Sequence, residues 1–321
     1  ASDIVYDASN KRESDVEVAD NKFDFAEGNV TYLSRADGFA NYAEATAAPA
    51  DFELPAEAKA TFYCNSNWNP EDFNNADDVA PTTGAKNGLK LKDMVGVDYN
   101  DAQWDTFLDQ LTVADMDKLI ALGGYQSVAV DSIGKVQAID CDGPASINNN
   151  FTKQGSIGFP SAVMIAATWN TDLAHDFGTS IGKMADDMDV SGWYAPAMNI
   201  HRSAFAGRNF EYYSEDGVLS GAMAANAIMG SQEQGVYAFM KHFALNDQET
   251  NRCGMLCTWS NEQAIREIYL KPFEQCIKAA DCHAVMSSFN YIGNTYAGNC
   301  SALLNDVLRG EWGFVGMVLT D

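Results

Sequence analysis

The sequence has few basic residues for its length, with 20 lysines and arginines against 45 aspartates and glutamates. The formal net charge is −25 at pH 7, and the acidic residues are spread along the chain without forming one acidic tail. Such a field repels phosphate backbones and anionic membrane surfaces, so it argues against nucleic acid as a partner. A neutral ligand such as a sugar is not repelled in this way.

Cysteine is scarce and irregularly spaced. The seven cysteines form an odd set without a Cys-x-x-Cys pair, which argues against a full disulfide framework. Cys253 and Cys257 come nearest to a motif, but no histidine or second cysteine pair stands at metal-ligand spacing. We therefore predict no metal site and no cofactor. Unpaired cysteines favour a reducing compartment, as in a cytoplasmic or cell-associated bacterial protein.

Long apolar runs are missing as well. No run reaches the about 18 residues that suggest a membrane-spanning helix, and the first residues have neither the basic nor the apolar part of a signal peptide. The chain begins without Met and stops at Asp321, directly after an apolar run. We therefore expect it to be an internal piece of a larger protein.

Residues 1–100 have little helical periodicity and are rich in Asp, Asn, Ala and Pro. We interpret them as an extended linker along a larger body, following the last strand of a preceding domain at residues 4–6. Helical spacing begins near residue 101, and Thr112 is a candidate N-cap for a second helix that ends at a glycine pair. This pattern predicts a helical hairpin.

Further along, short apolar runs alternate with longer amphipathic stretches. The predicted strands are residues 136–139, 162–167, 193–198, 237–240, 284–286 and 316–319. The predicted helices between them include residues 171–188, 216–232, 261–279 and 301–311. Such alternation indicates a parallel sheet, either doubly wound or closed into a barrel.

Two observations favour the barrel. No Gly-x-Gly-x-x-Gly or phosphate loop follows the first strand, and polar residues follow the carboxyl ends of several strands, where barrel enzymes build their sites. We therefore predict an α/β fold in which residues 101–321 form a TIM-type (β/α) barrel that is truncated at its C-terminal end.

The residues that follow the strands are candidates for a site, although each has a simpler explanation. Arg202 and Arg208 follow the strand at 193–198, where an ion-paired surface loop would account for them equally well. Lys241 and His242 end the next strand, and a solvated loop is there the less favoured alternative. Asp142 precedes Gly-Pro, where a turn-capping aspartate is as plausible as a functional one.

Two residues near the end of the chain are less informative by themselves. Phe289 could form a platform for a sugar with Tyr291, although aromatic residues here are more often core. Asp321 ends a strand, where plain solvation is the more usual explanation. Together, however, the candidates place carboxylates, arginines, a lysine and a histidine at one barrel mouth. Such groups suit the vicinal hydroxyls of a sugar, and clustered carboxylates suit glycosidic cleavage.

Five segments in residues 100–321 closely resemble the catalytic barrel of glycoside hydrolase family 3, the β-glucosidase and β-xylosidase group, in the family's order. They are Asp142-Gly-Pro, Gly207-Arg-Asn-Phe-Glu-Tyr-Tyr-Ser-Glu-Asp, Lys241-His-Phe-Ala-Leu-Asn-Asp-Gln-Glu-Thr-Asn-Arg, Ser287-Ser-Phe-Asn and Gly313-Phe-Val-Gly-Met-Val-Leu-Thr-Asp. The resemblance implies a retaining β-glycosidase that hydrolyses terminal β-glucosyl or xylosyl residues of oligosaccharides and glycosides by double displacement.

The resemblance also implies residue roles. Asp321 matches the family's nucleophile. The residues that match the pocket for the sugar next to the cleaved bond are Asp142, Arg208, Lys241 and His242. Arg202 occupies a second arginine position near that pocket. Phe289 stands where many members carry a tyrosine, whose hydroxyl it lacks.

The general acid is not assigned within this chain. One branch of the family supplies it from a His-containing loop after Lys-His-Phe, but this chain has Ala244-Leu-Asn-Asp there. The glucosidase branch supplies a Glu from a separate α/β sandwich domain. Residues 21–35 look like the linker of members in which that domain precedes the barrel, so we expect the acid/base domain upstream.

Two other functions stay open. The chain could be a catalytically silent carbohydrate-binding fragment that lacks its acid/base domain. A phosphate-binding barrel enzyme is disfavoured by the negative charge and the missing phosphate loop.

Overall fold

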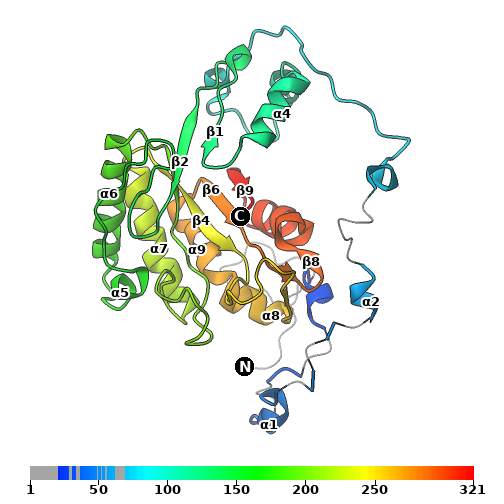
Figure 1. The fold of residues 1–321 in the computed structure, drawn as a ribbon, viewed down its shortest axis with the longest axis vertical. Helices are drawn as coiled ribbons and strands as arrows, with labels where there is room; N and C mark the ends of the chain where they lie inside the picture. The colour runs from blue at the N-terminus through cyan, green and yellow to red at the C-terminus, as the bar shows by residue number, and fades with distance from the viewer. Residues whose placement is uncertain are drawn as a thin grey trace.

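The computed structural model describes residues 21–28, 31–33, 37–48, 50–51, 53–54, 56–61 and 69–321. The strand predicted at residues 4–6 lies outside the described residues, as do parts of the predicted linker. The described residues up to 94 hold short helical elements joined by extended chain along one side of the molecule (Figure 1). These elements are η1 (Asp24–Ala26), α1 (Tyr42–Ala45), α2 (Ala56–Lys59), η2 (Pro70–Phe73) and η3 (Leu91–Met94).

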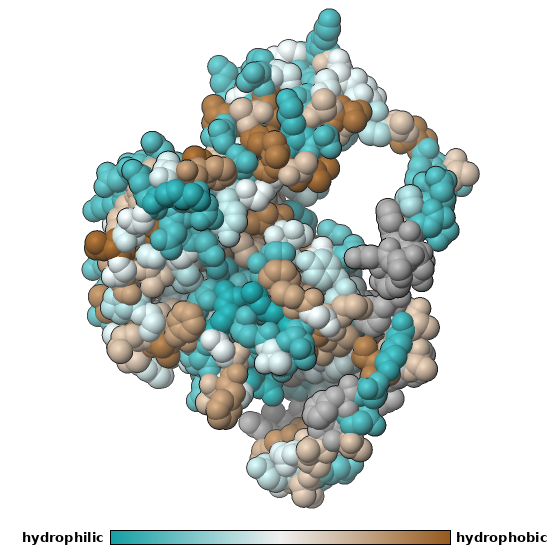
Figure 2. Space-filling model, viewed as in Figure 1, coloured by the Kyte–Doolittle hydropathy of each residue, from teal (hydrophilic) through white to brown (hydrophobic). Residues whose placement is uncertain are grey.

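The predicted helical hairpin is confirmed as α3 (Gln103–Leu108) and α4 (Val113–Ala121). The Thr112 side chain accepts a hydrogen bond from the backbone N–H of Asp115. The Asp115 carboxylate accepts one from the backbone N–H of Thr112, which completes a capping box. With η4 (Asp131–Ile133), the hairpin encloses a small apolar cluster that includes Met94, Phe107, Leu111, Val130 and Ile133. Apolar residues also lie exposed on the surface of this lobe (Figure 2), among them Val95, Val113, Ile120 and Val136.

A six-stranded sheet with the order β1-β2-β3-β4-β6-β9 forms the centre of the main body. Its strands are β1 (Gln126–Ser127), β2 (Ala138–Asp142), β3 (Gly192–Tyr194), β4 (Tyr237–Phe243), β6 (Ala284–Ser287) and β9 (Met317–Leu319). β1 pairs antiparallel with β2, and each later neighbour pairs in parallel. The predicted mixed α/β class with a parallel sheet is therefore confirmed.

The parallel strands separate two apolar layers because successive side chains point to opposite faces. Trp193, Met240 and Val285 belong to the large cluster beneath the helices. Their neighbours Tyr194 and Phe239 belong to a smaller cluster on the other face. The sheet is thus apolar on both sides, as expected for a parallel sheet.

Helices α6 (Thr171–Asp187), α7 (Gly217–Gln232) and α9 (Lys271–Ala280) cover the outer face of this sheet (Figure 1). α6 and α7 approach so closely that a Cβ atom at Gly178 would lie 2.0 Å from the carbonyl oxygen of Ala227. A Cβ atom at Gly230 would lie 2.3 Å from the carbonyl oxygen of His175. These two glycines permit the close contact between α6 and α7.

Several predicted elements differ from those observed. The strand predicted at residues 162–167 is wrong, because these residues form the helix α5 (Ala162–Ala166), in which Ile165 and Ala166 are buried but Met164 is exposed. A short apolar run does not distinguish a strand from a buried helix. The strand predicted at 193–198 ends at Tyr194, before Pro196, which has no N–H to donate.

The helix predicted at 261–279 is divided into α8 (Glu262–Ala264), the π-helical η5 (Ile265–Tyr269) and α9. Pro272 lies in the first turn of α9, where its missing N–H costs little. The helix predicted at 301–311 is the π-helical η7 (Ala302–Glu311). The remaining elements are η6 (Ala297–Asn299) and a small sheet of β5 (Cys257–Thr258), β7 (Tyr291–Ile292) and β8 (Thr295–Tyr296). Across the described residues, no helix is both long and apolar enough to cross a membrane.

Candidate active site

Five of the predicted site residues meet at the carboxyl edge of the parallel sheet. Asp142 ends β2, Lys241 and His242 lie in β4, and Asp321 follows β9. The loop between β3 and α7 contributes Arg208. Parallel strands present their carboxyl ends on the same edge, which explains why residues far apart in the sequence come together.

Lys241 lies at the centre of this group, with a side chain that is only 3% exposed. Its Nζ atom lies 2.9 Å from Asp142 Oδ1 and 3.4 Å from Glu211 Oε1. Burial acts to raise the pKa of Asp142, but the Lys241 ammonium and the N–H of Gly143 outweigh it and lower that pKa below its ordinary value. Asp142 therefore stays ionised near neutral pH.

Arg208 is fixed by Glu211 through two hydrogen bonds. Nε donates to Oε2 at 2.7 Å and Nη2 donates to Oε1 at 2.8 Å, a geometry in which the planar guanidinium matches the carboxylate. Burial acts to lower the pKa of Arg208, but these bonds raise it above its ordinary value. Glu249 lies on the other side, with Oε1 at 3.7 Å from Arg208 Nη1. Arg208 is thereby oriented before any ligand binds.

His242 is enclosed among cations. Burial lowers its pKa well below the ordinary value, and Lys241, Arg208 and Arg252 add to this effect. Its ring is neutral near pH 7 as a result. Nδ1 lies 3.3 Å from the Tyr212 hydroxyl and Nε2 lies 3.7 Å from Asp321 Oδ2. A neutral imidazole in this place can donate or accept one hydrogen bond toward a ligand.

Asp321 has a partly exposed carboxylate that faces His242 and Arg252. Arg252 Nη1 lies 3.5 Å from Asp321 Oδ2. Burial raises the pKa of Asp321, while Arg252, Lys241 and Arg208 act to lower it. Burial outweighs these cations, so the pKa of Asp321 lies above its ordinary value.

Phe289 is half-buried and contacts the site through Arg252, whose guanidinium lies 4.6 Å from the centre of the phenyl ring. Tyr296 of β8 lies close enough to Asp321 to feel its charge, because burial and this carboxylate both raise the pKa of the tyrosine. Phe289 therefore positions a cation next to Asp321 and has no hydroxyl to offer to it.

Arg202 lies apart from these residues. It is exposed, and its guanidinium lies 5.5 Å from the centre of the Tyr269 ring in η5. It also faces Asp247, whose Oδ1 accepts the Ile200 N–H at 2.7 Å. Burial raises the pKa of Asp247 to about 7, although Ile200 and Arg202 act to lower it. The structure does not bring Arg202 to Asp321.

The sequence left three charged members of the site without a role. Glu211, Glu249 and Arg252 form a chain of ion pairs with Arg208, in which Arg252 Nε lies 2.9 Å from Glu249 Oε2. The spacing of three residues between Arg208 and Glu211, and again between Glu249 and Arg252, is the signal that could have suggested them.

Among the described residues, no group of three or more His, Cys, Asp or Glu side chains is arranged to hold a metal ion.

Comparison with known proteins decides the family. Residues 136–321 match the model of the glycosyl hydrolase family 3 N terminal domain. The chain belongs to glycosyl hydrolase family 3. The family to which five sequence segments pointed is therefore confirmed.

Family 3 relatives cover most of the described body. A β-glucosidase from Rhizobium radiobacter is 39% identical over 221 residues, and β-glucosidase A from Butyrivibrio fibrisolvens is 38% identical over 228 residues. Each alignment covers 68% of this chain but only 27% of the relative. The chain thus spans little more than a quarter of the length of these relatives.

Solved structures of β-glucosidases are similar to part of this chain. β-Glucosidase 3B from Thermotoga neapolitana, in complex with glucose, is 43% identical with a TM-score of 0.57, covering 61% of this chain and 28% of that protein. A β-glucosidase from Paenibacillus barengoltzii is 30% identical with a TM-score of 0.66, covering 76% of this chain and 27% of that protein.

Proposed function

We propose that this chain carries the sugar-binding pocket and the nucleophile of a retaining β-glycosidase that acts on terminal β-glucosyl or xylosyl residues. The observation that carries the proposal is the placement of Asp321. Its carboxylate lies 3.7 Å from His242 and 3.5 Å from Arg252, on the sheet edge that also holds the Asp142–Lys241 pair. The relatives named β-glucosidases support the substrate class.

The proposed pocket binds the terminal sugar through its hydroxyls. Asp142, held ionised, accepts hydrogen bonds from two adjacent hydroxyls, while Lys241 and Arg208 donate to their oxygens. The neutral His242 ring adds one further donor or acceptor near Asp321. These groups are already fixed by one another, so little ordering is needed when the sugar binds.

The proposed reaction has two displacements. Asp321 attacks the anomeric carbon while the bond to the leaving oxygen breaks, and that oxygen takes a proton from a general acid. Water then attacks the glycosyl-enzyme ester, gives a proton to the same group acting as base, and releases Asp321. Burial raises the pKa of Asp321, and the nearby cations act in the opposite direction, toward the ionised form that attacks.

The proposal extends to the architecture. The strands β2, β3, β4, β6 and β9 would be part of a (β/α) barrel formed by residues 101–321, which other parts of the protein complete. Residues 1–100 would be the linker from a preceding domain. A Glu from that upstream domain would be the general acid, and the much greater length of the relatives supports such a domain.

The test is covalent labelling of the full-length enzyme. We expect 2,4-dinitrophenyl 2-deoxy-2-fluoro-β-glucoside to add one fluoroglucosyl group, which peptide mapping places on Asp321, because this leaving group needs little acid help. The Asp321→Asn variant should take no label. A label on another residue, or none with either this glucoside or the corresponding xyloside, contradicts the proposal. A catalytically silent carbohydrate-binding protein would instead take no label, yet glucose would raise its Tm.

A further inference from the structure

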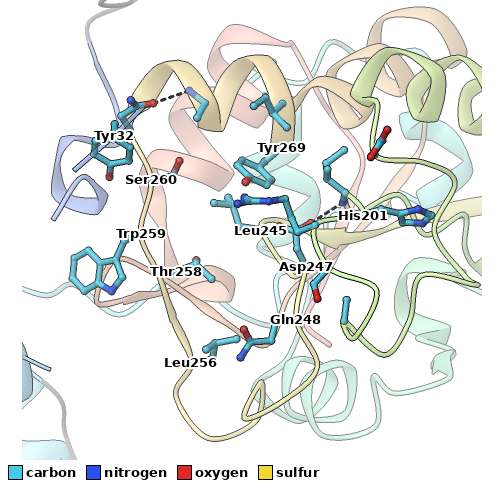
Figure 3. Close-up of a pocket in the computed structure, with 18 of the residues that line it drawn as sticks. Tyr32, His201, Leu245, Asp247, Gln248, Leu256, Thr258, Trp259, Ser260 and Tyr269 are labelled. Atoms are coloured by element: carbon cyan, nitrogen blue, oxygen red, sulfur yellow. Dashed lines mark hydrogen bonds between the residues drawn. The ribbon is translucent and has the colours of Figure 1, made fainter. Parts of the chain in front are cut away.

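The two sides of the loop after β4 line different places. Asn246, Glu249 and Arg252 face the Asp321 group, where they contact Tyr212, Arg208 and Asp321. Leu245, Asp247, Gln248 and Thr250 line a separate cavity of about 1400 Å³ (Figure 3). None of Asp142, Arg208, Lys241, His242 and Asp321 lines this cavity. The mechanism proposed above therefore makes no use of it.

Aromatic rings form part of the cavity wall. Trp259 directly follows β5, Tyr269 is the last residue of η5, and Tyr32 comes from the N-terminal part of the chain (Figure 3). Trp259 packs against Gly28, where an added Cβ atom would lie 2.8 Å from its Cε3 atom, so the backbone supports the indole ring. Tyr269 is buried beneath Arg202, whereas Trp259 is partly exposed, so Trp259 is the ring on which the apolar face of a sugar can stack.

Polar groups lie next to these rings. The Arg202 guanidinium lies over Tyr269, and Asp247 lies beside Arg202, which together offer fixed donors and an acceptor. Glu215 and Asp216 also line the cavity and, with the chain's net charge of −25, disfavour an anionic ligand. The volume exceeds the about 300–1,000 Å³ of typical small-ligand pockets. A neutral ligand with many hydroxyls and more than one ring fits these features.

We propose that this cavity is a second, non-catalytic site for a neutral oligosaccharide, which stacks on Trp259 and hydrogen-bonds to Arg202 and Asp247. This inference goes beyond the proposed function. Only the choice of β-linked sugars as probes rests on that function. Arg202, which the sequence suggested as a ligand of the catalytic pocket, is assigned here to the second site.

The test is calorimetric titration of cellotetraose and xylotetraose into the full-length Asp321→Asn enzyme, with saturating glucose present to occupy the catalytic pocket. We expect one remaining binding site, weakened at least 10-fold by Trp259→Ala and less than about threefold by Trp259→Phe, which keeps a ring. Trp169→Ala is the matched control, because Trp169 is 76% exposed and does not line the cavity. The Trp169→Ala variant should bind the tetrasaccharides with the same affinity as the Asp321→Asn enzyme in which it is made.

Separate hydrolysis assays distinguish the two proposals. Trp259→Ala in the otherwise unchanged enzyme should hydrolyse 4-nitrophenyl β-glucoside with kcat/KM within about twofold of the parent. Binding of neither oligosaccharide, or binding that Trp259→Ala leaves intact, overturns the second site whatever the labelling of Asp321 shows. If another part of the full-length protein fills the cavity, Trp259→Ala will lower the Tm and no oligosaccharide will bind, which also overturns it.

Discussion

Arg252, which lies over the Phe289 ring, is one of the groups that affect the ionisation of Asp321. Burial raises the pKa of Asp321, and Arg252, stacked on Phe289, is the first of the cations that oppose this effect. Arg252→Met should therefore raise this pKa further and move the acid limb of the kcat/KM profile to higher pH, since the proposed nucleophile must be ionised. Arg252→Lys keeps the charge and should move the limb less. An acid limb that stays in place in Arg252→Met would contradict this prediction.

Lys241 holds two carboxylates at once, so its loss affects stability as well as binding. Lys241→Met leaves Glu211, whose side chain is 5% exposed, without this cation, and we expect a loss of about 3 kcal/mol in the free energy of unfolding at pH 7. This is the low end for a broken buried pair, because Asp142 is half-exposed and Glu211 keeps its two hydrogen bonds from Arg208. Urea denaturation measures it, with the full-length enzyme as reference.

The part of this loss that comes from the Asp142–Lys241 pair depends on pH. The pKa of Asp142 is lower in the folded protein than its ordinary value of 3.8, so the ion pair contributes fully above about pH 4. The contribution is lost as the pH falls through the folded pKa. The difference between Lys241→Met and the parent should shrink below about pH 4, and stability curves that stay parallel down to about pH 3 would argue against this pair.

The sequence predicted those site residues that lie at the carboxyl ends of strands. Asp142, Lys241, His242 and Asp321 lie at strand ends, and apolar runs that stop at polar residues reveal such ends. It did not reveal on which side of a loop a side chain lies. Arg202 and Arg208 are six residues apart, yet one faces Tyr269 and the other Glu211. That difference depends on the path of an irregular loop, which periodicity does not encode.

The α6–α7 contact depends on the missing side chains of Gly178 and Gly230. Gly178→Ala would place a Cβ atom 2.0 Å from the Ala227 carbonyl oxygen, so the helices must separate. We expect a loss of about 3 kcal/mol, measured by urea denaturation. Gly158→Ala is the control, because an added Cβ atom there meets nothing within 4 Å. Equal effects of the two substitutions would show that the close contact is not responsible.

Long elements were predictable from the sequence, and short or irregular ones were not. α6 and α7 begin within one residue of their predicted starts because Asn170 and Asp216 cap them. The helix α5 was missed because five apolar residues fit either a helix or a strand. β1, β5, β7 and β8 have two residues each and leave no periodic signal. The sequence also gives no signal that distinguishes the π-helical η5 and η7 from ordinary α-helix.

Among the described residues, buried apolar side chains form one large cluster and two small ones. The hairpin of α3 and α4 encloses its own small cluster, whereas α6, α7 and α9 share the large one. Segments with few buried contacts open more readily than the core. Amide hydrogen exchange should therefore be at least about 100-fold faster in α3 and α4 than in α6 and α7 at the same pH. Uniform protection across these four helices would contradict two separately opening units.

The order of the site residues along the chain has a consequence for biosynthesis. Asp142, Arg208, Lys241 and His242 all precede Asp321, which is translated about 80 residues after His242. At about 5–20 residues per second, the groups that hold the sugar leave the ribosome roughly 4 to 16 seconds before the group that attacks it. On the proposed roles, a nascent chain could recognise a sugar before it could cleave one.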